Sequence, residues 1–399
     1  MCDCSGNIIS INDEICLYEL TAGQEETCCS IKNSLDVYGR QILCWGGLFF
    51  NSITILLFFN KGLSGVFFNR LLLCLAIFDN MYLIISIMDA WISSQENPNF
   101  YHDYAYFFII YPAKNITMCC TIYMTLLLAF ERYNSTTNPH VKKEVSWIGV
   151  LKFVLPVVVF SILFKMPTFF DFDVASIKVG GDNNKQSFPN TGYVIAEHIS
   201  IEKTYNITTR ITVSNMRSDE LYVLLYMTIA NIIFTGVLPV ALLAFLNFHI
   251  YKGVTKFHQR RGTILSTGLG VQPANDKTSD EITQAKILFA IVLVFVLCHT
   301  LRILLNLEDW IGHKTRFDEY ENKGCKYGTP YWALVAIPIS EILLRVNASI
   351  NFFIYCAFNK SFRSVIFTHT LKTLTDCGIS NLVSTGLSSN IDERQTLLQ

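Results

Sequence analysis

Among the charged side chains inside long apolar segments, five lie toward the same end of these segments, at positions where a charge needs a partner. A charge placed in hydrocarbon costs roughly 3 kcal/mol, so such residues pair with one another or face a polar cavity. They are Asp89, Lys114, Arg302, Glu341 and Arg345. Two interpretations stay open. The side chains line a ligand cavity, or they neutralise one another, Glu341 with Arg345 and Asp89 with Lys114, and only shape the protein.

A second charged group, the Glu-Arg-Tyr triplet at 131–133, closes the apolar run 106–133. As a helix, the run crosses a ~30 Å hydrocarbon core, with Arg132 at one face and Lys114 about 27 Å away near the other. An arginine is permanently charged and needs a partner at the membrane edge. Glu281 begins a later apolar segment on the same side and can hold Arg132 at rest. Breaking that contact would free Arg132 for a partner protein; the alternative is an arginine that only extends into water.

Asp79 lies in the middle of an apolar segment, where an unpaired carboxylate is more stable in its protonated form. Polar side chains on other segments can supply contacts to it. They are Asn51, Thr121, Asn347, Ser349 and Asn351. These residues predict a buried polar site. Whether it is a hydrogen-bonded packing cluster or also holds an ion stays open.

Seven apolar windows carry these residues. The 399-residue chain has 16% charged and 51% hydrophobic residues, whereas a soluble domain has roughly 25% charged residues. Each window is long enough to span a bilayer as a helix. The windows cover Gln41 to Asn60, Val66 to Ile92, Tyr104 to Tyr133, Trp147 to Phe170, Glu220 to Tyr251, Ile282 to Leu307 and Tyr331 to Ala357. They predict an all-α membrane protein, a seven-transmembrane helix bundle over residues 41–357.

Polar segments connect the windows. An N-terminal segment covers residues 1–40, a long polar insert about 171–219, a loop with little expected regular structure about 252–281, and a tail 370–399. An odd number of spans places the two chain ends on opposite sides. Positive charge gathers after the third and fifth windows, which predicts that those loops face the cytosol and that the N-terminus is extracellular.

Asn206-Ile-Thr is the glycosylation sequon that falls in the extracellular insert on this topology. We expect a sugar on Asn206. An Asn206→Gln variant should therefore lose the gel shift that enzymatic deglycosylation produces in the wild type. A shift that is the same in both proteins would place the sugar elsewhere.

The order and spacing of these motifs resemble a rhodopsin-like (class A) G-protein-coupled receptor, and the resemblance covers the chain from Gln41 to Arg363. The matching residues are Asn51, Leu75-Ala76 with Asp79, Glu131-Arg132-Tyr133, Pro239, Glu281, Asn351-Phe-Phe-Ile-Tyr355 and Phe358-Asn-Lys-Ser-Phe362-Arg363. The last stretch is similar to the family's short amphipathic eighth helix, expected over 358–369. Stretches that begin at Phe164, Cys298 and Val346 resemble invertebrate FMRFamide-type neuropeptide receptors.

The resemblance implies a plasma-membrane receptor that binds an extracellular, FMRFamide-like neuropeptide and activates a heterotrimeric G protein. Arrestin, receptor kinases and membrane lipid are the further partners that it implies. The alternative is a seven-helix binding or scavenging receptor with weak or no G-protein coupling. The implied ligand-binding residues are Asp89, Lys114, Arg302, Glu308, Asp309, Glu341 and Arg345. Asp89, Glu308 or Asp309 would meet a ligand arginine, and the basic residues would meet carbonyl groups or acids.

The resemblance also assigns roles to the two other polar sites. The implied G-protein switch consists of Glu131, Arg132, Tyr133, Glu281 and Tyr355. At the Asp79 site it implies a sodium ion that responds to activation. No other cofactor or metal is expected.

The pattern of the family is broken at the outer end of the third helix. The family ties this end to the following extracellular loop by a disulfide, but Tyr101–Tyr111 and Asp171–Glu220 contain no cysteine. Cys325 can instead pair with Cys28 or Cys29, and the sequence does not choose between them.

Two further departures lie in the sixth and seventh helices. His299 replaces the aromatic switch residue of the sixth helix, and Leu301 replaces the proline that kinks it, so the bend must be smaller or arise elsewhere. Phe352 replaces the proline of the seventh-helix motif.

Other functional classes find no support in the sequence. It contains no Gly-rich phosphate loop, nucleophile elbow or metal-spaced His/Cys cluster, so we do not expect an enzyme. The net charge of −1 says nothing about nucleic acid, and no basic tract suggests a nucleic-acid partner, so we expect none.

Overall fold

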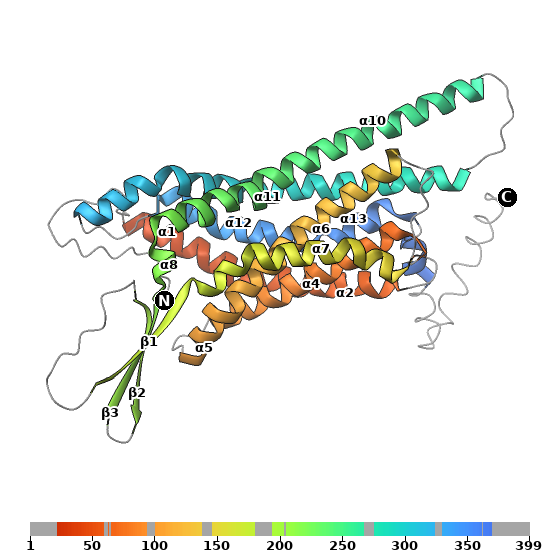
Figure 1. Cartoon of the computed structure of the whole chain (residues 1–399). Helices are drawn as coiled ribbons and strands as arrows, with labels where there is room; N and C mark the ends of the chain where they lie inside the picture. The colour runs from red at the N-terminus through yellow and green to blue at the C-terminus, as the bar shows by residue number, and fades with distance from the viewer. Residues whose placement is uncertain are drawn as a thin grey trace, which may run out of the picture.

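The computed structural model describes residues 22–59, 63, 65–93, 100–137, 146–179, 194–202, 205–266, 275–323, 329–360 and 362–368. Within them, seven helices are long and apolar enough to cross a membrane. They run side by side as one bundle (Figure 1). The prediction of a seven-transmembrane helix bundle is confirmed.

The seven spans are built as follows. The first two are α2 (Arg40–Phe58), preceded by α1 (Ala22–Asn33) and η1 (Ser34–Gly39), and α4 (Phe67–Ser93). The third passes through α5 (Phe100–Ala105), η2 (Tyr106–Ile110) and α6 (Tyr111–Thr137), and the fourth through α7 (Trp147–Lys165) and η3 (Met166–Phe170). The fifth passes through α9 (Glu220–Tyr222), η4 (Val223–Ala230), η5 (Ile232–Val237) and α10 (Leu238–Ser266). The sixth is α11 (Asn275–Lys323), and the seventh is α12 (Tyr331–Ser349) with α13 (Asn351–Phe358).

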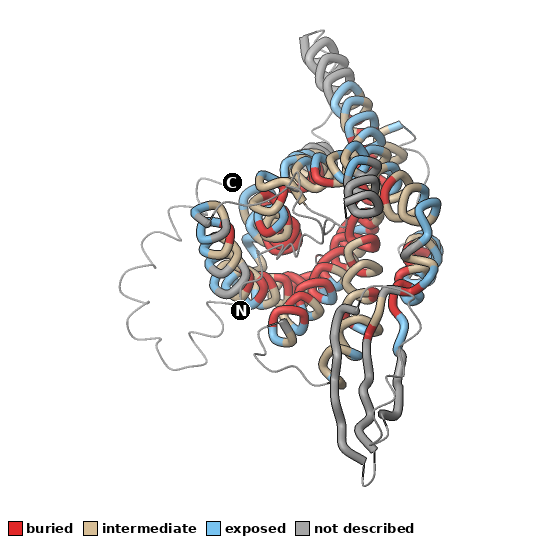
Figure 2. The backbone as a smooth tube through the Cα atoms, turned by 90° about the vertical axis from the view of Figure 1, so that its left-hand side faces the viewer, coloured by how far each residue is buried: buried red, intermediate tan, exposed pale blue. Residues whose placement is uncertain are grey.

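The largest apolar core lies where α4 and α6 face α10, α11 and α13. Its fully enclosed side chains include Leu71, Leu75, Met124, Leu128 and Phe295. In Figure 2 the buried positions, drawn in red, face the interior of the bundle. Within the third span, α6 contacts α4, α7, α10 and α11.

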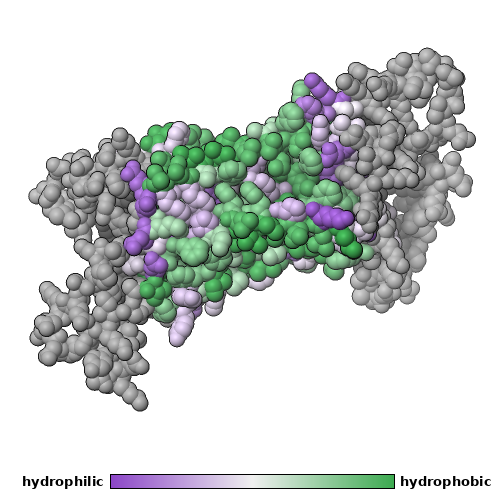
Figure 3. Space-filling view, in the orientation of Figure 1, coloured by the Kyte–Doolittle hydropathy of each residue, from purple (hydrophilic) through white to green (hydrophobic). Residues whose placement is uncertain are grey.

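Large apolar side chains also cover the outside of the bundle. Ile42, Leu56, Ile148, Leu163 and Leu297 are each more than half exposed. Figure 3 shows an apolar band across the middle of the molecule with polar residues at both ends. Such a surface is suited to contact with lipid hydrocarbon. The side chains that it presents are apolar, and the backbone polar groups are already hydrogen-bonded within the helices.

The insert between the fourth and fifth spans forms a three-stranded antiparallel sheet in the order β1-β3-β2, which the sequence analysis did not predict. The strands are β1 (Phe172–Val179), β2 (Val194–Glu202) and β3 (Tyr205–Val213), and the short α8 (Asn215–Ser218) follows them. The run of β-branched residues in β3 was the signal for it. The backbone of Asn206 lies in β3, opposite Val179 and Ile201. We call the end of the bundle that carries this sheet the sheet end.

The prediction of little regular structure over 252–281 is wrong for its described parts. The fifth span continues as a helix to Ser266, and the sixth begins at Asn275. Neither stretch contains a proline, whereas Pro273 lies in the gap between them. A helix started by an apolar span can therefore continue past the membrane edge.

The sixth and seventh spans reflect the missing prolines differently. α11 is a single uninterrupted helix over 49 residues, as the loss of the kink proline would suggest. The seventh span is interrupted at Ile350, between α12 and α13, although Phe352 stands where the family has a proline. Residues 362–368 are helical, and Phe362 is fully buried against Phe58 and Tyr355.

Candidate functional site

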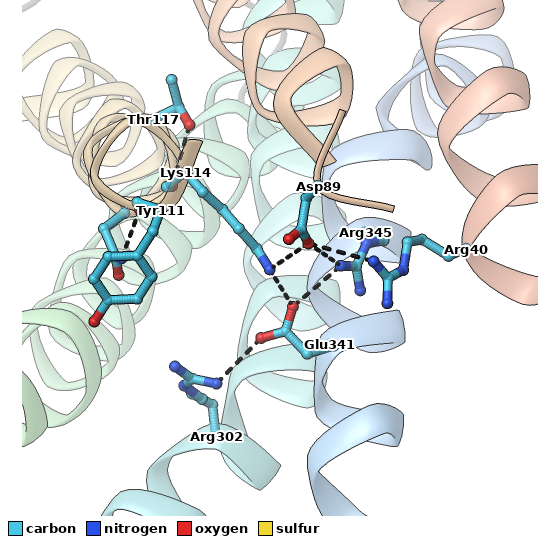
Figure 4. A network of polar contacts seen from close by, with 9 residues as sticks. Arg40, Asp89, Tyr111, Lys114, Thr117, Arg302, Glu341 and Arg345 are labelled. Carbon is cyan, nitrogen blue, oxygen red and sulfur yellow. Dashed lines mark hydrogen bonds and ion pairs between the residues drawn. The ribbon is translucent and has the colours of Figure 1, made fainter. Parts of the chain in front are cut away.

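A network of ion pairs joins helices at the sheet end of the bundle (Figure 4). Lys114 of α6 points between α4 and α12. Its Nζ lies 3.0 Å from Asp89 Oδ2 and 3.0 Å from Glu341 Oε2. Its side chain is about one fifth exposed, at 22%, so these contacts are largely withdrawn from water.

Three arginines complete the network. Arg345 is fully buried, and its guanidinium lies 3.2 Å from Glu341 Oε2 and 3.9 Å from Asp89 Oδ2. Arg302 of α11 lies 3.3 Å from Glu341 Oε1, and Arg40 of α2 lies 3.4 Å from Asp89 Oδ2. Four cations thus surround two carboxylates, which leaves a surplus of two positive charges within these six residues.

The network contains both pairs that the neutralisation interpretation requires, Asp89 with Lys114 and Glu341 with Arg345. Sequence reasoning missed Arg40, because it sits at the edge of the first window and reads as a loop charge. The contacts link the first, second, third, sixth and seventh spans, so the network shapes the bundle. Ligand contact by these residues stays a prediction.

A cavity of about 170 Å³ adjoins the network, between α6, the fourth and fifth spans and α11. Residues that line it include Tyr111, Lys165, Asp171, Asn231, Arg302 and Asp309. Arg302 therefore belongs to both the cavity and the ion-pair network. Of the two other predicted ligand residues, Asp309 lines this cavity and Glu308 does not.

Sequence reasoning did not name Lys165, although it lies inside the fourth apolar window, five residues before its end. It is only 3% exposed. Its Nζ donates to Asn231 Oδ1 and lies 4.9 Å from the centroid of the Phe164 ring. A buried cation whose described contacts include a neutral amide and a ring is a candidate for ligand contact.

At the opposite end of the bundle, Arg132 is 8% exposed and is held by neighbours on two helices. Its Nε donates to Glu131 Oε2 at 2.5 Å, and a terminal nitrogen donates to the side-chain oxygen of Gln284 on α11. Ser135 Oγ in turn donates to Glu131 Oε1 at 2.8 Å. The guanidinium carbon also lies 4.4 Å from the centroid of the Phe68 ring.

The described contact between Arg132 and the sixth span is therefore made by Gln284, which sequence reasoning did not name. Gln284 lies three residues after Glu281 and so on nearly the same helix face. The side chain of Glu281 lies outside the described residues, and its pairing with Arg132 stays a prediction. Tyr133 packs against His249, with ring centroids 6.0 Å apart, and Tyr355 is fully buried.

At the Asp79 site the structure brings some predicted residues together. Asn351 Nδ2 donates to Asp79 Oδ2 at 2.8 Å, and Asn51 Nδ2 donates to the carbonyl of Ala348 at 2.8 Å. Thr121 and Ser349 instead direct their hydroxyls to backbone carbonyls on their own helices, and Ser349 also donates to the carbonyl of Leu43.

The oxygen chemistry of this site fits a sodium ion. Asp79 Oδ1 and Asn51 Oδ1 are buried, and neither has a hydrogen-bond partner in the described part of the chain. Hard cations take such oxygen ligands. Asn347 is half-buried on α12. Across the described ranges, no group of three or more His, Cys, Asp or Glu side chains could hold a metal ion. Cys325 lies outside the described residues, so its disulfide stays a prediction.

Two receptors are similar to the chain. It is 25% identical to the FMRFamide receptor of Drosophila melanogaster over 269 residues, and this match covers 66% of this chain and 40% of that receptor. It is 22% identical to the FMRFamide peptide receptor frpr-18 of Caenorhabditis elegans over 331 residues, and this match covers 80% of this chain and 65% of that receptor. The matches thus span less than two thirds of either relative. No protein-family model matches the chain.

Both relatives are receptors by name, and neither is named as an enzyme. The chain is therefore a seven-transmembrane helix bundle that is similar to FMRFamide receptors, and its Glu131-Arg132-Tyr133 group at one end of the third span is consistent with the class A G-protein-coupled receptors that its sequence resembles.

Proposed function

We propose that the protein is a plasma-membrane receptor that binds an FMRFamide-like neuropeptide outside the cell and activates a heterotrimeric G protein inside it. The observation that carries the proposal is the arrangement of the third span. Its sheet end bears Lys114 within the ion-pair network, and its other end bears Arg132. Both relatives are FMRFamide receptors by name. The N-terminus is extracellular in this proposal, on the same side as the sheet end.

Arg302 is the residue through which a ligand in the cavity would act on the bundle. It lines the cavity, and its side chain is 36% exposed while it holds Glu341. A peptide carbonyl or carboxylate that binds Arg302 would compete with Glu341 for the guanidinium. Arg302 and Gln284 lie on the same helix, α11, about 27 Å apart at ~1.5 Å per residue. Release of Arg302 would thus loosen the helix whose other end contacts Arg132.

The name FMRFamide spells Phe-Met-Arg-Phe-amide, so the ligand carries an arginine. Asp89 and Glu341 already face four cations of the network. A ligand cation would have to displace one of them. Asp309 lines the cavity, whereas Asp89 and Glu341 are not among its lining residues, so we assign the ligand arginine to Asp309. Arrestin and receptor kinases are further partners in this proposal, acting on the serines and threonines of the tail.

Peptide-stimulated nucleotide exchange tests the function directly. FMRFamide added to membranes that contain the full chain and a heterotrimeric G protein should accelerate GTPγS uptake. Binding of labelled FMRFamide without exchange would instead support the binding or scavenging receptor. Neither binding nor exchange with FMRFamide or other amidated peptides would contradict the proposal.

We further propose that sodium binds at Asp79, because two buried oxygens there can accept a cation. Sodium should then lower the affinity of labelled FMRFamide in the wild type, and Asp79→Asn should remove that dependence. A potassium buffer of equal ionic strength is the control, because it separates an effect of sodium from a general effect of salt. An equal sodium response in the wild type and the Asp79→Asn variant would rule out an ion at this site.

A further inference from the structure

Asp171 is a buried joint between several elements at the sheet end. It directly follows the fourth span and precedes β1, and it is 1% exposed. Tyr222, at the start of the fifth span, donates its hydroxyl to Asp171 Oδ1 at 2.9 Å. Tyr111 of the third span and Arg217 of α8 donate to Asp171 Oδ2, at 3.5 Å and 3.3 Å. One carboxylate thus connects the third, fourth and fifth spans with the segment that follows the sheet.

The neighbouring residue adds an aromatic contact between the insert and the third span. The ring of Phe172 lies 4.5 Å, centroid to centroid, from Phe107 and 5.7 Å from Tyr111. The guanidinium carbon of Arg217 lies 4.8 Å from the centroid of the Phe172 ring. The backbone N–H of Ser214 donates to the carbonyl of Asp171 at 3.1 Å, which holds the end of the sheet segment against its beginning.

These contacts occupy the place where the sequence lacks a covalent tie. Neither Tyr101–Tyr111 nor Asp171–Glu220 contains a cysteine, so no disulfide can join the outer end of the third span to the insert. Phe107 and Tyr111 belong to the first of these segments, while Asp171 and Phe172 begin the second. The hydrogen bonds and ring contacts therefore join the same two segments by non-covalent means.

Burial and the polar neighbours of Asp171 act on the pKa of its carboxyl in opposite directions. Burial raises the pKa of the Asp171 carboxyl, although Arg217, the hydroxyls of Tyr222 and Tyr111, and Lys165 act to lower it. The folded protein therefore binds this proton more tightly than the unfolded chain does. Accordingly, the contribution of Asp171 to the free energy of unfolding falls as the pH rises from the ordinary pKa of an aspartate carboxyl through the raised pKa of Asp171.

We propose that Asp171 and Phe172 form a non-covalent clasp that positions the outer end of the third span and the wall of the ligand cavity. Asp171 and Tyr111 line that cavity themselves, as does Lys165 at the end of the same fourth span. The clasp makes the geometry of the cavity independent of thiol oxidation. Its consequence for peptide recognition rests on the proposed function, whereas its mechanical role does not.

Hydrogen–deuterium exchange of the full chain in lipid nanodiscs tests the mechanical role without a ligand. In Asp171→Ala, amide exchange should rise roughly tenfold in both residues 105–112 and residues 171–174, because the hydrogen bonds that join them are lost. Exchange around Arg132, at the far end of the same helix, should stay unchanged. Asp173→Ala is the matched control, since Asp173 carries the same charge two residues away and is exposed.

Milder variants keep the test decisive if Asp171→Ala folds poorly. Tyr222→Phe removes one hydroxyl donor and should raise exchange in the same two segments by a smaller factor. Dithiothreitol should leave their exchange in the wild type unchanged. Exchange in both segments that is the same in the wild type, Asp171→Ala and Tyr222→Phe would overturn the clasp, as would loosening by dithiothreitol to the extent seen in Asp171→Ala.

A binding measurement separates positioning from general stability. Tyr222→Phe should weaken labelled FMRFamide binding several-fold while the melting temperature of the purified protein matches that of Asp173→Ala. A loss of affinity that only follows a loss of melting temperature would overturn the positioning role. If the exchange results hold but wild-type protein binds no FMRFamide, the proposed function fails and the clasp stands.

Discussion

Replacing Arg132 with alanine should reduce FMRFamide-stimulated GTPγS exchange by about 10- to 150-fold, the value of one charge-assisted hydrogen bond at roughly 1.5 to 3 kcal/mol. Arg132 lies at the end of the third span and is held by Glu131 on its own helix and Gln284 on α11. In the proposed mechanism, activation releases the guanidinium from these partners to the G protein. Alanine offers the G protein no such group, so ligand binding would persist without exchange.

Two matched variants sharpen this prediction. Arg132→Lys keeps the charge but loses the planar fork, and should recover only part of the exchange. Gln284→Ala removes the contact of Arg132 with α11 and leaves Glu131 in place, so basal exchange without peptide should rise. Full peptide-stimulated exchange by Arg132→Ala at equal surface expression would refute the switch, and unchanged basal exchange in Gln284→Ala would refute its resting contact.

Replacing Glu341 with glutamine should cost about 3 to 5 kcal/mol of stability, as expected when a buried ion pair loses one partner. Glu341 contacts Lys114 at 3.0 Å, Arg345 at 3.2 Å and Arg302 at 3.3 Å. Without its charge, the four cations of the network would have one carboxylate, Asp89, which Arg40, Lys114 and Arg345 contact. The melting temperature of the purified protein measures the loss.

Two further substitutions test the prediction for Glu341, one as a control and one as a compensating change. Glu220→Gln removes an equal charge from an exposed position at the sheet end, and should leave the melting temperature nearly unchanged. Adding Lys114→Met to Glu341→Gln removes one of the surplus cations and should restore part of the stability. If Glu341→Gln melted at the same temperature as Glu220→Gln, the network would not stabilise the bundle.

Some features of the fold could be predicted from the sequence because their cause is local. A helix that spans a bilayer needs about twenty consecutive apolar residues, so each window can be recognised from its own sequence alone. The start of the fourth span was expected at Trp147 and the start of the seventh at Tyr331, and both helices begin there. The charged residues inside the windows stood out for the same reason.

Partner choice, in contrast, was decided by the tertiary structure. Arg40 joins Asp89 because the first and second spans lie side by side, although 49 residues separate the two in sequence. Gln284 meets Arg132 across 152 residues. Such contacts depend on which helices are neighbours and on how each helix is rotated about its axis. The hydropathy of the sequence predicts neither of these.

The sheet and the Asp171 clasp were likewise invisible to a search for membrane spans. β1 pairs with β3 rather than with β2, the next strand along the chain, so the register arises from non-local hydrogen bonds. The sequence by itself determined that the outer end of the third span has no cysteine to fasten it. Only the folded chain brings Tyr111, Arg217 and Tyr222 to one carboxylate, because these residues come from separate segments that meet only in the assembled bundle.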